Sequence, residues 1–156
     1  MRCLTRCLRN DKAFSLVEVL VVMAIMAILT GGAVASIAIV NNANVNKAAN
    51  ALDNAFTKAR TIGMAKGSSY HFQTVMVGNT LYAYIGDPAT GMEKEKISGG
   101  GVSVVLPASS DYTFSADGSV RGVTGNVKTV YKFTHGERTA EFWFHSLTGE
   151  HGVTLN

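Results

Sequence analysis

One acidic residue, Glu18, interrupts an otherwise uncharged and mostly apolar run of the chain that extends from Phe14 to Val40. A carboxylate in such a run has no cation beside it in the sequence, and an uncompensated buried charge is strongly destabilising. Within a segment that can enter a membrane, an ionisable residue is therefore a candidate functional residue. The alternative is that Glu18, the fifth residue of the run, reaches the lipid headgroups and has no partner.

The histidines offer less chemistry. His71 and His145 lie within alternating strand patterns, which favours ordinary half-buried side chains. Neither His-x-x-x-His nor Glu-x-x-His occurs, so no short spacing presents two ligands to a metal. The Gly-x-Ser-x-Gly sequence of a hydrolase nucleophile elbow is also missing. We therefore predict that the protein is not an enzyme and has no catalytic residues, metal site or cofactor.

A second polar cluster lies in the segment GDPATGMEKEK. Oxygen-rich loops bind calcium, and Asp87, Glu93 and Glu95 would supply such oxygens. Their spacing does not fit an EF-hand, and Lys94 and Lys96 offset their charge. The pattern therefore predicts a solvated turn rather than a calcium site.

The formal net charge of +3 is confined to the start of the chain. From Phe14 onward, basic and acidic residues are equal in number. Because a domain that binds nucleic acid through its charge is itself basic, we expect no nucleic-acid partner.

Both cysteines, Cys3 and Cys7, lie in the same basic stretch, so the rest of the chain has no disulfide and no thiol chemistry. The basic residues of this stretch are Arg2, Arg6, Arg9 and Lys12.

The apolar run is longer than the ~20 residues that span a bilayer core. It is also longer than the apolar region of a secretory signal peptide, which has about 7–15 residues. Basic residues precede the run, and the next charge after it is Lys47. By the positive-inside rule we expect a single-pass protein of the cytoplasmic (inner) membrane, with a cytoplasmic N-terminus and an extracytoplasmic C-terminal domain.

Residues 41–66 have the period of an amphipathic helix, with the polar residues Lys47, Asp53, Lys58 and Arg60 on the face opposite the apolar stripe. No proline lies between Phe14 and Lys66, so this helix and the apolar run are expected to form one long helix that ends at Gly67. The paired Gly31 and Gly32 predict either a packing face or a kink. The apolar stripe consists of Val45, Ala49, Leu52, Phe56, Ala59 and Ile62.

From Ser69 to the C-terminus the pattern is that of short strands. Gly78-Asn79 and Gly136-Glu137 each separate two strand-like segments, which is typical of a β-hairpin. Asp117-Gly118 and Thr148-Gly149 are further turn signals. No helical period longer than two turns follows Lys66, so we predict an α+β protein in which the long helix packs on an antiparallel β-sheet.

The sequence KAFSLVE around Glu18 resembles the class III signal of type IV pilins and of the pseudopilins of type II secretion. The resemblance implies that a prepilin peptidase cuts between Ala13 and Phe14 and methylates the new N-terminus. It also implies that Glu18 pairs in the assembled filament with the N-terminal amine of Phe14 in a neighbouring subunit. The family usually has glycine before the cut, where this chain has Ala13.

The resemblance further implies a pilin-like fold with three parts: a basic leader at 1–13, a transmembrane and assembly half of the helix at 14–40, and a globular head at 41–156. The head would contain the amphipathic helix 41–66 and the β-rich region 69–156. Its turns at Phe114 to Gly118 and at Thr148-Gly149 are similar to those of the FimT and pseudopilin H group.

This family implies a structural subunit, a minor pilin or pseudopilin, whose partners are other subunits, prepilin peptidase, the inner-membrane assembly platform and membrane lipid. Two alternatives stay open: a membrane-anchored extracytoplasmic binding domain, and a DNA-uptake minor pilin. Some FimT-like proteins bind DNA through a GRxR sequence, but Glu150 and His151 stand at the corresponding place here. A basic patch for DNA would instead use Lys128, Lys132 and Arg138.

Overall fold

The computed structural model describes residues 15–66, 70–99, 101–125 and 127–156, and for residues 32–38 the helical backbone alone. Two compact units are present, Met1–Ala38 and Ile39–Asn156. We describe each unit by itself.

Helix α1 extends from Leu16 to Lys66, as expected for a segment without proline. The two adjacent glycines do not interrupt it. A Cβ atom placed on Gly31 would meet no atom within 4 Å, so packing within this chain does not require glycine there. The expected end of the helix at Gly67 lies outside the described residues.

The second unit contains nine strands in the described residues, all paired antiparallel. They form two sheets, one with the strand order β3-β2-β1-β5-β6 and the other with the order β4-β7-β8-β9. The predicted hairpins at Gly78-Asn79 and Gly136-Glu137 are confirmed as the β1–β2 and β7–β8 connections. The strands are β1 His71–Val77, β2 Thr80–Asp87, β3 Gly91–Lys96, β4 Ser103–Val105, β5 Asp111–Phe114, β6 Val120–Arg121, β7 Lys128–His135, β8 Arg138–His145 and β9 His151–Leu155.

The prediction of a solvated turn throughout GDPATGMEKEK was wrong, because its second half is the edge strand β3. Glutamate and lysine have low strand propensity. They are, however, the residues with which natural proteins protect a sheet edge from pairing with other chains. The pairing of β3 with β2 over six residue pairs outweighs the weak local preference.

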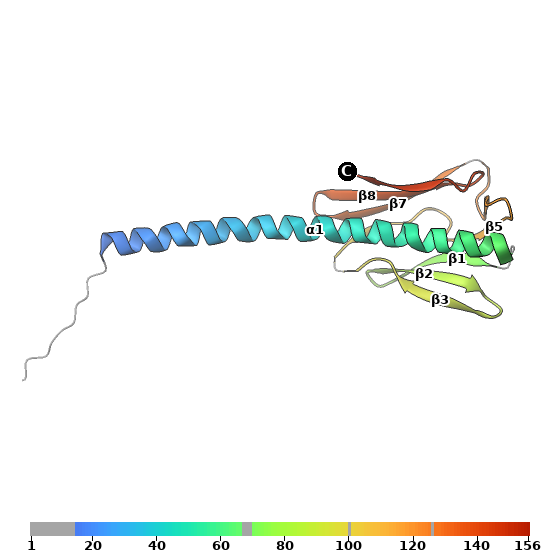
Figure 1. Cartoon of the computed structure of the whole chain (residues 1–156), viewed down its shortest axis with the longest axis horizontal. Helices are drawn as coiled ribbons and strands as arrows, with labels where there is room; N and C mark the ends of the chain where they lie inside the picture. Colours follow the sequence, from blue (N-terminus) through green and yellow to red (C-terminus); the bar gives the residue numbers. More distant parts are fainter. Residues whose placement is uncertain (1–14, 67–69, 100, 126) are drawn as a thin grey trace, which may run out of the picture. The chain divides into compact units, whose positions relative to one another are not determined.

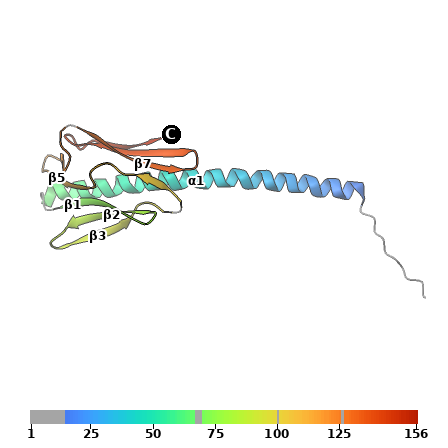
Figure 2. The ribbon, with the colours of Figure 1, turned by 180° about the vertical axis from the view of Figure 1, so that it is seen from behind.

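The C-terminal part of α1 packs against both sheets, as Figures 1 and 2 show. Phe56 is fully buried and is the centre of this contact. Its ring lies 5.5 Å from Phe72 of β1 and 4.8 Å from Phe144 of β8, measured between centroids. Alanines around Phe56 allow the helix to approach both sheets closely. The buried helix residues are Val45, Ala48, Ala49, Leu52, Ala55, Phe56 and Ala59.

The predicted apolar stripe is confirmed apart from its last member. Ile62 is only half-buried, and Gly63 is buried in its place. A Cβ atom on Gly63 would come 2.9 Å from the ring of Phe114, so the close approach of helix and β5 requires glycine.

A buried polar contact also joins the two sheets. The hydroxyl groups of Thr74 in β1 and Tyr131 in β7 are 3.0 Å apart, and Tyr131 in turn donates to the hydroxyl of Tyr112 in β5 at 3.5 Å. The Tyr112 hydroxyl donates to the carbonyl of Ser109. Burial raises the pKa of both tyrosines. The predicted α+β, pilin-like architecture, a long helix packed on antiparallel sheet, is thus confirmed.

Candidate functional site

The described part of the N-terminal motif begins at Ser15, immediately before α1. The Ser15 carbonyl accepts hydrogen bonds from the backbone N–H groups of Glu18 at 2.9 Å and Val19 at 3.2 Å. Glu18 therefore lies in the first turn of α1, and its side chain is exposed. A carboxylate is favoured there because the N-terminus of a helix carries a partial positive charge. The other predicted site residues, Ala13 and Phe14, lie outside the described residues.

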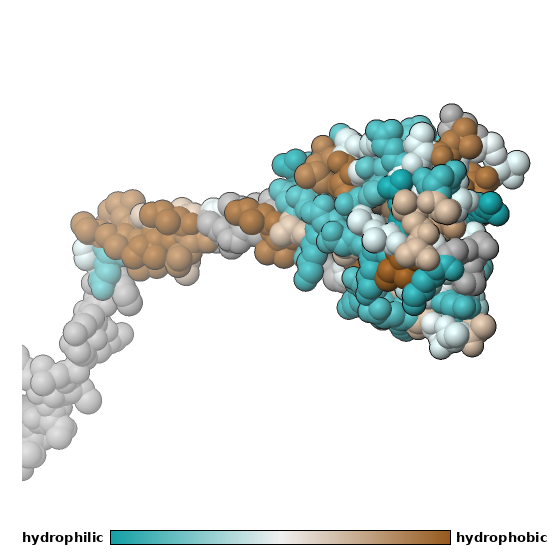
Figure 3. Space-filling model, turned by 45° about the vertical axis from the view of Figure 1, so that its right-hand side comes forward, coloured by the Kyte–Doolittle hydropathy of each residue, from teal (hydrophilic) through white to brown (hydrophobic). Residues whose placement is uncertain are grey.

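The side chains that surround Glu18 on α1 are large, apolar and exposed. Leu16 is 77% exposed and Ile28 is 74% exposed. Figure 3 shows this part of the helix as hydrophobic surface. A large exposed apolar surface of this kind marks a contact with membrane or with another protein. The exposed residues are Leu16, Val17, Val19, Leu20, Val21, Val22, Met23, Ile25, Met26, Ile28 and Leu29.

Comparison with known protein families identifies a motif in this segment. Residues 8–34 match the prokaryotic N-terminal methylation motif. The matched residues include Ala13, Phe14 and Glu18, so the chain carries the class III signal of type IV pilin-like proteins. The match supports a processed subunit of the type IV pilin-like kind. No curated protein and no solved structure showed significant similarity to the chain.

Within the part of the chain that is described, no helix is both long and apolar enough to qualify as a membrane span.

In the head, hydrogen bonds from Arg60 join two turns to α1. Its Nε donates to the Gly118 carbonyl at 3.1 Å and its Nη2 donates to the Thr148 carbonyl at 3.2 Å. Gly118 and Gly149 both have positive φ, and a side chain at either would collide with the Arg60 guanidinium. The sequence placed Arg60 on a polar face of the helix, and the structure shows that this face contacts the turns before β6 and β9.

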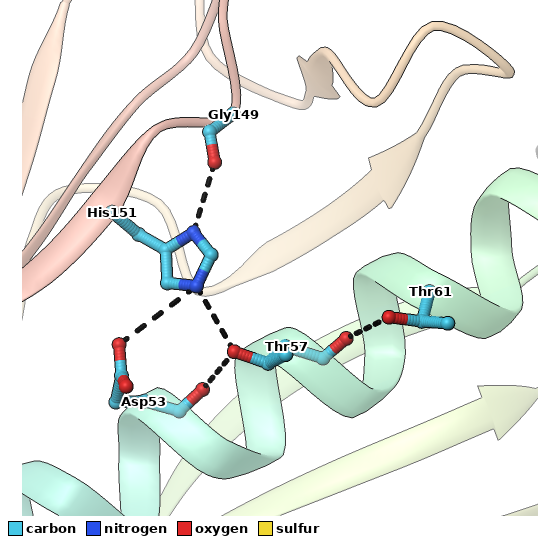
Figure 4. Close-up of polar contacts among 5 residues, drawn as sticks. All are labelled: Asp53, Thr57, Thr61, Gly149 and His151. Carbon is cyan, nitrogen blue, oxygen red and sulfur yellow. Dashed lines mark hydrogen bonds and ion pairs between the residues drawn. The ribbon is translucent and has the colours of Figure 1, made fainter.

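His151 of β9 makes a second contact of this kind (Figure 4). Its Nδ1 lies 3.0 Å from the Gly149 carbonyl, so this nitrogen carries a proton and donates it. Its Nε2 lies 2.9 Å from the Thr57 hydroxyl and 3.9 Å from the Asp53 carboxylate. The ring centroid is 5.0 Å from that of Phe56. Sequence reasoning missed this role, because the helix and β9 are far apart in the chain.

The arrangement around His151 joins strand β9 to helix α1. Each polar atom of the imidazole is engaged by the protein itself, and the Thr57 hydroxyl also contacts the Asp53 carbonyl at 2.8 Å. Among the described residues, no group of three histidine, cysteine, aspartate or glutamate side chains is arranged to hold a metal ion.

The basic residues considered for DNA do not form one patch. The Lys128 ammonium lies 4.6 Å from the ring of Trp143, and the Lys132 ammonium lies 3.8 Å from Glu141. Arg138 lies at the start of β8, at the opposite end of the hairpin from Lys128. The structure therefore separates the three cations and places an acid beside one of them.

Proposed function

We propose that the protein is a minor pilin or pseudopilin, a processed structural subunit of a type IV pilus or type II secretion-like filament. The observation that carries the proposal is the methylation motif at 8–34 together with Glu18 at the start of an exposed apolar helix. An exposed carboxylate in an apolar surface needs a cation when that surface is covered. The amine of a processed N-terminus supplies one.

In this proposal, prepilin peptidase removes residues 1–13 and methylates Phe14. The apolar half of α1 then anchors the subunit in the inner membrane, with the basic leader on the cytoplasmic side and the head outside. An assembly platform transfers the subunit to a filament, where α1 packs against the same helix of its neighbours. Glu18 of one subunit pairs with the Phe14 amine of the next.

The free energies of two interactions indicate that a buried Glu18 needs a charged partner in addition to the helix terminus. The partial charge of a helix N-terminus stabilises an anion by roughly 0.3–1 kcal/mol at an exposed site. Removing one member of a buried ion pair costs about 3–5 kcal/mol. The helix terminus can therefore support Glu18 in the free subunit, but it does not compensate burial between packed helices.

Mass spectrometry of the protein extracted from the membrane of its native host tests the proposal. We expect the N-terminal peptide to begin with methylated Phe14. A chain that still begins at Met1, in a host with an active prepilin peptidase, would contradict it. The alternative of a membrane-tethered binding domain predicts processed or unprocessed protein in membranes and none in sheared filaments.

A further inference from the structure

The charged residues of β3 lie on two opposite faces of the strand. Successive side chains of a strand point to opposite sides, so Glu93 and Glu95 share one face and Lys94 and Lys96 share the other. Lys58 of α1 donates to both carboxylate oxygens of Glu93, at 2.9 and 2.8 Å. Hydrogen bonding to Glu93 raises the pKa of Lys58. The negative charge of β3 is thus directed toward α1, and its positive charge lies on the outer face.

The outer face of this sheet also carries two tyrosines. Tyr82 and Tyr84 are two residues apart on β2, so their backbone positions are about 6.6–6.8 Å apart along the strand and their side chains share a face. The Lys94 ammonium lies 3.9 Å from the centroid of Tyr82 and 5.7 Å from that of Tyr84. Such a cation–π contact is worth about 0.5–1 kcal/mol at an exposed site, so a ligand can displace it.

Hydrogen-bonding groups continue the same face across the next strands. Gln73 of β1 lies opposite Tyr84, and Asp111 of β5 lies opposite Gln73. The Asp111 carboxylate contacts the His71 imidazole at 2.9 Å, so its charge faces a partner on the protein. One cross-strand row therefore presents an ammonium, an aromatic ring, an amide and a carboxylate: Lys94, Tyr84, Gln73 and Asp111.

We propose that this surface, the tyrosine–lysine face formed by Gln73, Tyr82, Tyr84 and Lys94, binds an acidic polysaccharide. Tyr82 and Tyr84 are partly exposed, and such aromatic rings stack on the apolar faces of sugar rings. An amide on the same row hydrogen-bonds to hydroxyl groups, and an ammonium binds a carboxylate with a charge-assisted hydrogen bond. The inference goes beyond filament assembly and does not depend on it.

Charge density distinguishes this ligand from nucleic acid. A nucleic acid carries a phosphate at every nucleotide, and tight complexes neutralise about 6–10 of them. The tyrosine–lysine face has few cations, and basic and acidic residues are equal in number from Phe14 onward. A polymer of sugars with one carboxylate per ring or fewer, whose rings also stack, matches this sparse charge better.

The test measures binding of polygalacturonate to the immobilised full chain in detergent, by biolayer interferometry. Uncharged dextran and single-stranded oligothymidylate serve as comparison polymers. We expect polygalacturonate to bind at least about tenfold more tightly than either. Lys94→Gln and Tyr84→Ala are each expected to weaken its binding at least about tenfold, whereas Tyr84→Phe, which keeps the ring, is expected to retain it.

Lys132→Gln is the matched control, because it removes a half-exposed lysine from the outer face of the other sheet. It is expected to leave binding unchanged, and circular dichroism checks that every variant is folded. The proposal is overturned if wild type does not bind polygalacturonate, or if Lys132→Gln weakens binding as much as Lys94→Gln. Tighter binding of dextran or of oligothymidylate would also overturn it. None of these results bears on the N-terminal mass that tests the proposed function.

Discussion

At the scale of single residues, the chain places charged and polar groups where each needs a specific partner. Glu18 is exposed on an apolar helix, and the proposed partner belongs to another subunit. Tyr131, in contrast, finds its partners Thr74 and Tyr112 within the same head. Substitutions of Glu18 are therefore expected to affect assembly, whereas substitutions of Tyr131 are expected to affect the stability of the head.

Replacing Glu18 with alanine is expected to leave cleavage and membrane insertion intact, because the proposed cut lies between Ala13 and Phe14 and the mutant helix is more apolar. Incorporation into filaments should fall by more than about tenfold, since loss of one member of a buried pair costs about 3–5 kcal/mol. The measurement compares processed protein in the membrane and sheared-filament fractions.

Glu18→Gln separates charge from hydrogen bonding in the same assay. It should behave as Glu18→Ala does if the charge pairs with the amine. Normal entry of the alanine variant into filaments would show instead that Glu18 is an acid tolerated near the membrane interface.

Alkaline titration is predicted to unfold the head, because burial raises the pKa of Tyr112 and Tyr131 above the ordinary value of 10.0. Below pH 10 both states keep these protons, so the contribution to the free energy of unfolding is constant. Above about pH 10 the unfolded chain loses protons that the folded head retains, and stability falls.

Spectrophotometric titration of tyrosinate, followed together with circular dichroism, measures this effect. We expect Tyr112 and Tyr131 to ionise only as the β-sheet signal is lost. Ionisation of all the tyrosines in a head that stays folded would contradict the prediction. The double variant Tyr112→Phe with Tyr131→Phe should show a weaker decline above pH 10.

At the scale of elements, the C-terminal part of α1 is the component against which the other elements are fixed. Phe56 contacts both sheets, Arg60 binds the turns before β6 and β9, and Thr57 contacts His151. Strand β9 is a short edge strand, paired only with β8 among the described strands. Its position therefore depends on contacts with α1 as well as on the sheet.

His151→Ala is expected to lower the free energy of unfolding by about 1–3 kcal/mol, because it removes two hydrogen bonds and a contact with Phe56. Urea denaturation measures the loss, and amide hydrogen exchange should accelerate most in β9. Thr154→Ala is the control, since Thr154 is exposed on the same strand and should change stability by less than about 0.5 kcal/mol. An equal effect of both variants would show that β9 is held by the sheet alone.

At the scale of the whole molecule, the two compact units have different surfaces. In the first unit, the large apolar side chains that the structure describes are exposed. The second unit buries its apolar residues in one core. Burial of that core relies on no disulfide, since both cysteines lie near the N-terminus. The second unit therefore has the features of a domain that folds without the first.

A fragment that begins at Asn41 is accordingly expected to be a soluble monomer with helix and strand in its circular dichroism spectrum. Its thermal unfolding should be a single cooperative transition, and Phe56→Ala should lower its stability by about 3–5 kcal/mol. Insoluble protein, or a spectrum without strand, would show that the head needs the preceding part of the helix.

The sequence by itself determined the features that depend on neighbouring residues. The period of residues 41–66, the absence of proline and the Gly-containing turns predicted the helix and two hairpins, because these patterns act over a few residues. The motif around Glu18 was equally readable, since it is a short contiguous segment. The structure adds the position of Glu18 in the first helical turn.

Only the tertiary structure decided the features that join distant segments. Strand β3 formed against its local propensity because β2 supplied a complete partner. Arg60 and His151 acquired partners dozens of residues away. The neutral run of glutamates and lysines became two oppositely charged faces, because a strand alternates its side chains and α1 takes up Glu93. These pairings and contacts join segments that are far apart in the chain, so no local pattern specifies them.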